Sequence, residues 1–195
     1  MIGPTLPVAA AFAAMLVIAV LGAKRGWKAS RTFLTCLAVA YGAAVVSVTL
    51  FPIPVQGSIL PWEREFGGLH SNFVPFIGLG EMITSQPLEI STRQIAGNIA
   101  MFVPFGLLLP LLWRDVRIRR VLLAAALASI AIEGSQFLIS SAIGFSYKMT
   151  DVDDVLLNSL GAVIGYGLAR GERALREGTG IFAPRPSGTE TQNAA

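Results

Sequence analysis

The chain has 195 residues, of which 53% are hydrophobic and only 14% are charged, whereas soluble domains carry about 25% charged residues. This balance, together with a mean hydropathy of +0.63, excludes an ordinary soluble domain and indicates a protein that lies in the bilayer. The net charge of +3 comes largely from Lys and Arg in short loops between apolar segments, so we expect no nucleic-acid partner.

Five apolar segments are each long enough to cross a membrane, since about 20 apolar residues span the hydrocarbon core. They are residues 5–23, 32–52, 95–113, 121–140 and 152–169. The sequence therefore predicts an all-α, polytopic membrane protein with five transmembrane helices. We expect a single domain over residues 1–175 and a disordered cytoplasmic tail over residues 176–195, because the end of the chain is polar and rich in Gly, Pro and Thr.

The basic residues predict the orientation of this bundle. Lys and Arg follow the first apolar segment and do not precede it, which is not the pattern of a secretory signal peptide. Four basic residues lie in each of the first loop, the third loop and the C-terminal tail, twelve in all, against three on the other side. We therefore expect the N-terminus outside, the C-terminus cytoplasmic, and a multi-pass protein of the bacterial plasma membrane with membrane lipids as partners.

The connection between the second and third segments, residues 53–94, is long and partly apolar. Its stretch HSNFVPFIGLGEMI is too apolar for a free linker and too short and broken to span the bilayer. Irregular backbone at membrane depth has to be buried in protein. We therefore predict an interfacial or re-entrant segment that packs on the helices.

Polar residues of the last two helices follow the helical period. The fourth helix has a polar stripe at spacings i, i+4, i+7 and i+11, which place side chains on one face. The stripe consists of Ser129, Glu133, Gln136 and Ser140. A similar stripe on the fifth helix consists of Asp154, Asn158, Gly161 and Gly165, with Asp151 beside it. Asp153 points roughly the other way, and we expect it to be solvated.

The polar positions of the last three helices lie at similar depths below the outer surface, at about 1.5 Å of rise per residue. We predict that they converge on one pocket in the outer leaflet, with Lys148 of the connecting loop as the partner of the Glu133 carboxylate. The candidate pocket residues are Asn72, Asn98, Glu133, Gln136, Lys148, Asp151, Asp154 and Asn158.

Structural roles stay open as alternatives for several of these positions. Asp151 is placed to cap the N-terminus of the fifth helix, and Glu133 to hydrogen-bond with Gln136 or Asn158. The seam of small residues, Gly161 and Gly165, allows the fifth helix to pack closely on a neighbour. That neighbour is another helix of the chain or, in an oligomer, a second copy.

These polar residues, in this order, resemble the pattern of the VanZ-like family of bacterial membrane proteins over about residues 41–169. The matching positions are Asn72-x-x-Pro75-Phe76, Asn98, Phe102-x-Pro104-Phe105-Gly106, Glu133-x-x-Gln136, Asp151-x-Asp153-Asp154, Asn158, Gly161 and Gly165. One position departs from the family pattern, in which an Arg usually stands shortly before the aspartates. Lys148 takes its place here, and Lys lacks the bidentate geometry with which Arg binds a phosphate or carboxylate.

The resemblance implies a cell-envelope role, since the family is named for a protein that gives low-level resistance to the glycopeptide teicoplanin. It brings no established enzymatic activity, and no activated nucleophile is evident in the sequence, so a non-enzymatic protein is favoured. The leading hypothesis is a pocket that binds a lipid headgroup, a glycopeptide, a lipid-linked envelope precursor or an ion.

Two other functions are weighed against this hypothesis. One is a membrane-embedded, metal-dependent hydrolase or transferase that acts on a phosphorylated lipid. Its cofactor would be a divalent cation, Mg²⁺ or Ca²⁺, held by oxygen atoms of Asp151, Asp154 and Glu133. The other is a small proton-coupled carrier with Glu133 as a relay, for which no inverted repeat is found in the sequence.

Overall fold

A computed structural model of the chain describes residues 1–55, 71–113 and 115–178. Within these residues the architecture is helical, and five helices are long and apolar enough to cross a membrane. They are α1 (Thr5–Lys24), α2 (Ala29–Leu50), α5 (Leu88–Leu112), α6 (Ile118–Ile143) and α7 (Val152–Gly178). The all-α fold with five candidate spans is thus as predicted, and the orientation in the membrane stays a prediction.

The third and the fifth predicted helices extend furthest beyond their apolar runs. The third span begins at Leu88, directly after Pro87, and not at residue 95, because polar residues of its first two turns also adopt the helix. The last span continues past its apolar run to Gly178, into the stretch predicted as tail. The rest of the predicted tail, residues 179–195, lies outside the described residues.

The long second loop contains a short helix, α4 (Ile77–Ser85), and a two-residue strand, β1 (Ser71–Asn72). The strand pairs in parallel with β2 (Thr150–Asp151), which directly precedes α7. Residues 56–70, which belong to the same predicted interfacial or re-entrant segment, lie outside the described residues, and its depth in the membrane stays a prediction.

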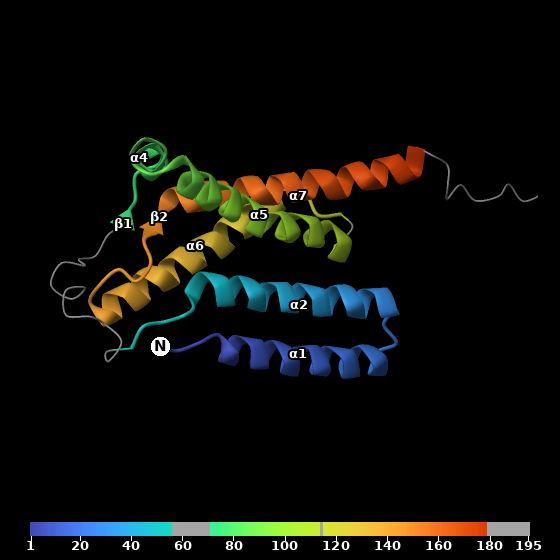
Figure 1. The fold of residues 1–195 in the computed structure, drawn as a ribbon. Coiled ribbons are helices and arrows are strands. Elements are labelled where there is room, and N and C mark those ends of the chain that lie inside the picture. The colour runs from blue at the N-terminus through green and yellow to red at the C-terminus, as the bar shows by residue number, and fades with distance from the viewer. Residues whose placement is uncertain (56–70, 114, 179–195) are drawn as a thin grey trace, which may run out of the picture.

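The helices form two neighbouring groups, which Figure 1 shows as a lower α1–α2 hairpin and an upper group of α5, α6 and α7. Gly26, with a φ of 64°, follows the C-terminal end of α1, and Gly144, with a φ of 84°, caps the C-terminal end of α6, because a left-handed residue at a helix end favours glycine. The buried core lies between the last three spans and consists of Phe102, Val121, Ala125 and Ala162.

The closest packing in the bundle is between α5 and α7. A Cβ added at Gly161 would meet the carbonyl of Ile99, and one added at Gly165 would meet the carbonyl of Val103. The predicted small-residue seam therefore packs two helices of the same chain against each other. Association of two copies through this seam stays a prediction.

The two ends of the bundle differ in the elements and charged residues that they contain. In Figure 1 the N-terminus, β1, β2 and α4 lie at one end, and α7 runs from there to the opposite end. We call the first the strand end and the second the basic end, since the first and third loops with their Lys and Arg residues lie there. The strand end is the one that the basic residues predict to lie outside.

Candidate functional site

The strands β1 and β2 bring three of the predicted residues together. Asn72 lies opposite Asp151 in the parallel pair, and its Nδ2 atom donates a hydrogen bond of 2.9 Å to the Asp151 Oδ1 atom. The Glu133 Oε2 atom accepts a hydrogen bond of 3.0 Å from the backbone N–H of Asp151. Asn72, Glu133 and Asp151 therefore meet at the strand end, although they come from three separate elements.

Asp153 was expected to be solvated, and this prediction is wrong. Its side chain is only 2% exposed, and its two oxygens accept hydrogen bonds from the backbone N–H groups of Phe76 at 2.6 Å and Leu79 at 2.8 Å. These N–H groups begin α4, so Asp153 of α7 caps the N-terminus of another helix. Phe76 has a φ of 69°, an unfavourable conformation for a bulky residue.

The structural alternative for Asp151 is present in the structure. Its Oδ1 atom also accepts a hydrogen bond of 2.9 Å from the N–H of Asp153, in the first turn of α7, which is the arrangement of an N-terminal cap. We call Asn72, Glu133, Asp151 and Asp153 the junction, because they connect α4, α6, α7 and both strands. All four contribute to hydrogen bonds that hold backbone in place.

The two asparagines of the membrane helices each bridge to a neighbouring helix. The Nδ2 atom of Asn98 on α5 donates a hydrogen bond to Asp154 on α7, and the Nδ2 atom of Asn158 donates one of 2.8 Å to Ser129 on α6. The Oδ1 atom of Asn158 is buried and has no hydrogen-bond partner among the described residues. Glu133 does not bond with Asn158 or Gln136, so that alternative is wrong.

The last carbonyls of α2 receive donors from residues of α6 and of the loop after it. The Gln136 Nε2 atom donates to Thr49 at 3.0 Å, and the Lys148 Nζ atom donates to Val48 at 2.8 Å. A cation at a helix C-terminus also interacts favourably with the helix dipole. Within the described chain no ion pair joins Lys148 to Glu133, so Lys148 has a different direct partner from the predicted one.

Burial changes the protonation equilibrium of Lys148, which lies in the loop between α6 and α7. Desolvation lowers the pKa of its ammonium group from the ordinary value of 10.5, and the negative charge of Glu133 opposes this shift. The charged form of Lys148 is therefore lost at a lower pH than that of an exposed lysine.

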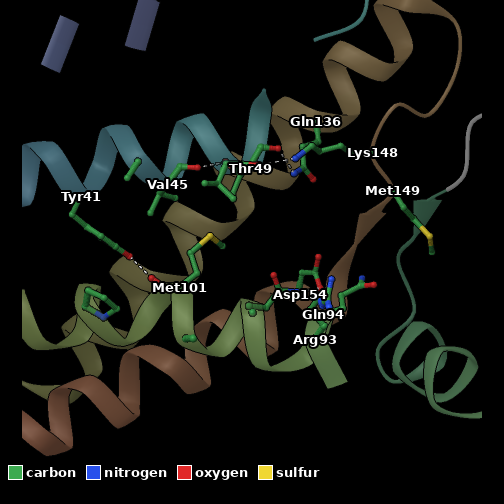
Figure 2. A pocket seen from close by; sticks show the side chains of 16 residues that line it. Tyr41, Val45, Thr49, Arg93, Gln94, Met101, Gln136, Lys148, Met149 and Asp154 are labelled. Carbon is green, nitrogen blue, oxygen red and sulfur yellow. Dashed lines mark hydrogen bonds between the residues drawn. The ribbon is translucent and has the colours of Figure 1, made fainter. Parts of the chain in front are cut away.

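Beside the junction lies a pocket of about 520 Å³ between α2, α5 and the start of α7. We call it the polar pocket, because charged and amide side chains gather in its wall (Figure 2). These polar residues are Arg93, Gln94, Asn98, Gln136, Lys148 and Asp154. Tyr41 and Thr49 of α2 form the facing wall, and the Tyr41 hydroxyl donates a hydrogen bond of 2.7 Å to the carbonyl of Met101 (Figure 2).

The structure divides the predicted pocket residues into two sets. Asn98, Gln136, Lys148 and Asp154 line the polar pocket. Asn72, Glu133, Asp151 and Asn158 do not line it, and their hydrogen bonds hold the elements around it. The whole α6 stripe is buried, as its spacing predicts.

Sequence reasoning missed the polar residues that α2 and the start of α5 add to the pocket. They are Tyr41, Thr49, Arg93 and Gln94. Arg93 carried a signal, because it is one of three cations on the predicted outer side. Tyr41 and Thr49 are isolated polar residues in an apolar run, and nothing in their spacing indicates the face on which they lie.

The predicted metal ligands do not form one group. Glu133 and Asp151 belong to the junction, whereas Asp154 lies in the polar pocket and accepts from Asn98. Among residues 1–55, 71–113 and 115–178, no set of three His, Cys, Asp or Glu side chains lies close enough together to hold a metal ion. Binding of a divalent cation stays a prediction.

A second, apolar cavity of about 330 Å³ adjoins the polar pocket. Tyr41 and Val45 line both cavities. We call the second cavity the apolar groove. Its wall consists almost entirely of apolar residues from α2, α5 and α6, among them Val46, Phe102 and Ile132.

Comparison with known proteins gives one match. The model of the VanZ/LLP1 family matches residues 33–175, which include the junction, the polar pocket and most or all of four of the five candidate spans. No curated protein and no solved structure matches the chain.

Proposed function

Since the chain belongs to the VanZ-like family of membrane proteins, we propose that it is a cell-envelope protein whose polar pocket binds the headgroup of a membrane lipid. The observation that carries this proposal is the contact between two unlike cavities. A polar pocket with two cations shares Tyr41 and Val45 with an apolar groove. Such a pair fits an amphiphile, whose headgroup and chain need opposite surroundings.

The headgroup side offers both donors and an acceptor. Lys148 brings positive charge to the rim, which favours a phosphate, while Arg93 forms an exposed ion pair of 3.2 Å with Glu89. Asp154 brings an acceptor for a hydroxyl or amine of the same headgroup. Pro104 in the wall has no N–H, so the carbonyl of Ala100 loses its usual helical donor and adds another acceptor.

The size of the polar pocket favours a headgroup over a whole glycopeptide. Pockets of about 300–1,000 Å³ hold drug-sized ligands, and a glycopeptide antibiotic is larger than that. We therefore propose that an effect on teicoplanin susceptibility follows indirectly from lipid binding. Among the described residues no three His, Cys, Asp or Glu side chains form a metal-binding group, and no observation favours a proton-coupled carrier.

The proposal is tested with purified protein in detergent, by following the rise in unfolding temperature as lipid is added, since a ligand of the folded state stabilises it. The probes are phosphatidylglycerol, phosphatidylethanolamine and undecaprenyl phosphate. We expect Lys148→Gln to weaken binding of the anionic lipids about tenfold, the effect of losing a charge-assisted hydrogen bond. We expect Val46→Trp, which fills the groove, to weaken binding of all lipids.

Two control variants carry the same types of substitution at positions outside the polar pocket and the apolar groove. Lys28→Gln removes a charge at the basic end, and Val8→Trp adds a large side chain on the lipid-facing surface of α1, where Val8 is 41% exposed. Both are expected to bind like the wild type.

The proposal fails if the folded Lys148 and Val46 variants also bind like the wild type, or if glycerol 3-phosphate, which has no chain, binds as tightly as phosphatidylglycerol. In cells, the two site variants are expected to raise teicoplanin susceptibility.

A further inference from the structure

A second polar cavity lies at the basic end of the bundle, opposite the polar pocket. It is an open cavity of about 730 Å³ between the α5–α6 connection, the start of α6 and the second half of α7. At a rise of about 1.5 Å per residue, the stretch of α7 from Asp154 to Arg170 separates the two cavities by about 24 Å. The cavity is therefore independent of the site that carries the proposed function.

The charges of this cavity are unbalanced. Arg117, Arg119 and Arg170 line it together with a single acid, Asp115. Within the described part of the chain, none of these three arginines takes part in an ion pair. Arg117 and Arg119 belong to the basic run at the start of α6, and the fold adds Arg170 from α7, which is distant in sequence.

The backbone adds further positive potential. Arg117 stands at the N-terminal end of α6, where free N–H groups and the helix dipole favour an anion. Two hydrogen bonds hold the wall in place. The Tyr166 hydroxyl donates to the carbonyl of Val116 at 3.3 Å, and the Arg173 Nη2 atom donates to the carbonyl of Pro110 at 3.1 Å.

Two exposed apolar residues at the end of α5 stand just before the cavity in the chain. Trp113, just before Asp115, is 60% exposed, and Leu111 is 37% exposed. An exposed tryptophan is typical of the boundary between headgroups and acyl chains. A soluble anion gains nothing from the exposed Leu111 and Trp113 side chains. A phospholipid, in contrast, places its phosphate among the arginines and its chains along these two side chains.

We propose that this cavity, which we call the arginine cavity, binds the phosphate of an anionic phospholipid from the leaflet at the basic end. Basic pockets between transmembrane helices on the cytoplasmic side recognise such headgroups. Guanidinium groups match phosphate geometry better than ammonium groups do. This site holds a lipid at the end of the protein that the polar pocket does not reach.

The test uses Trp113 as a local reporter. The chain has three tryptophans, so Trp27→Phe and Trp62→Phe leave Trp113 as the sole one. Phosphatidylglycerol with brominated chains quenches a tryptophan that it contacts, and brominated phosphatidylcholine is the zwitterionic comparison. In mixed micelles we expect phosphatidylglycerol to quench Trp113 at a concentration at least tenfold lower than phosphatidylcholine does.

Variants then separate the cavity from general surface charge. Arg117→Gln and Arg170→Gln are each expected to weaken the quenching by phosphatidylglycerol about tenfold, through loss of a charge-assisted hydrogen bond. Arg120→Gln removes the same charge from the same helix at a position that does not line the cavity, and we expect a change of less than about twofold, because Arg120 makes no charge-assisted hydrogen bond to a phosphate held there. Arg117→Lys keeps the positive charge and so serves as a second, conservative variant in case Arg117→Gln does not fold.

Three results would overturn the proposal. They are equal quenching by the two lipids, an equal loss for Arg120→Gln and Arg117→Gln, and displacement of phosphatidylglycerol by inorganic phosphate at the same concentration, which would assign the cavity to free phosphate. Lys148→Gln, which removes a charge from the polar pocket, is expected to leave the Trp113 signal unchanged. Failure of one site is thus distinguishable from failure of the other.

Discussion

Asp151, Asp153 and Asp154 stand within four residues of one another, and each carboxylate has a different partner. Asp151 accepts from Asn72 and from the first turn of its own helix, Asp153 accepts from the start of α4, and Asp154 faces Asn98 in the polar pocket. Two of the three thus stabilise backbone, and only Asp154 is available to a ligand in the pocket. Chemical function at this motif therefore has to be tested one residue at a time.

Replacement of Asp153 is expected to destabilise the fold. Asp153→Ala leaves the N–H groups of Phe76 and Leu79 without their acceptor, at a cost of about 1–3 kcal/mol in the free energy of unfolding. Asp153→Asn is expected to cost less, since its single amide oxygen still accepts one of the two bonds. Thermal unfolding in detergent measures both, with Glu81→Ala, an exposed acid on α4, as the control. Equal stability of Asp153→Ala and wild type would contradict the cap.

Lipid binding at the polar pocket is expected to depend on pH through Lys148. Because burial lowers the pKa of Lys148, its charge is lost at a lower pH than that of an exposed lysine, and affinity for phosphatidylglycerol is expected to fall as the pH rises through this lowered pKa. Lys148→Arg keeps its charge over the same range, so its binding is expected to stay constant. Titrations with phosphatidylglycerol between pH 7 and 10 check this. Identical pH profiles for the two proteins would exclude Lys148 from headgroup binding.

Predictions for single residues from the sequence were confirmed where they depended only on the period of the helix that carries the residue. The α6 stripe followed from the helical period, and its burial was found as expected. The role of Asp153 was not accessible, because its partners lie in a loop helix that is 74 and 77 residues away in the chain. Helix periodicity gives the direction of a side chain on its own helix, and it does not give what a distant loop places there.

At the scale of elements, the α5–α7 pair depends on residues without side chains. Gly106 and Gly165 bring each helix backbone against the other, with the carbonyls of Ala162 and Val103 at the positions that a Cβ would take. The spacing Gly161-x-x-x-Gly165 predicted a close neighbour but not which one. The sequence contains no signal that distinguishes α5 from a second copy of α7, and the structure identifies α5.

Alanine at these glycines is expected to push the two helices apart. Gly161→Ala places a methyl group against the Ile99 carbonyl and should destabilise the protein by about 1–3 kcal/mol, the usual cost of overpacking. Gly167→Ala on the same helix meets nothing within 4 Å. It should stabilise the helix by about 0.5–1 kcal/mol, because alanine has the higher helix propensity. Unfolding in detergent compares the two, and equal effects would contradict the α5–α7 seam.

For the whole molecule, the number of spans and the all-helical fold followed from hydrophobicity and length, because every backbone polar group in lipid needs an internal partner. The polar pocket and the apolar groove did not follow from them. A cavity depends on how α2, α5 and α6 are placed side by side, and this placement is set by packing between helices that hydropathy does not describe.

The predicted orientation is checked with single cysteines. In a background of Cys36→Ser, which removes the chain's one cysteine, Gln86→Cys lies near the strand end and Lys28→Cys at the basic end. A membrane-impermeant maleimide added to intact bacterial cells is expected to label Gln86→Cys and to label Lys28→Cys only after permeabilisation. The reverse pattern would invert the topology and place the polar pocket on the cytoplasmic side.

The hydrogen bonds from α7 also have a consequence for the order in which the protein is made. Asn98 and Glu133 find their partners in Asp154 and the N–H of Asp151, which leave the ribosome after both of them. At about 5–20 residues per second, several seconds pass before these partners are synthesised. During this time lipid offers Asn98 and Glu133 no replacement. We therefore expect α5 and α6 to be released into the bilayer only with the last helix, so that the three helices enter the membrane together.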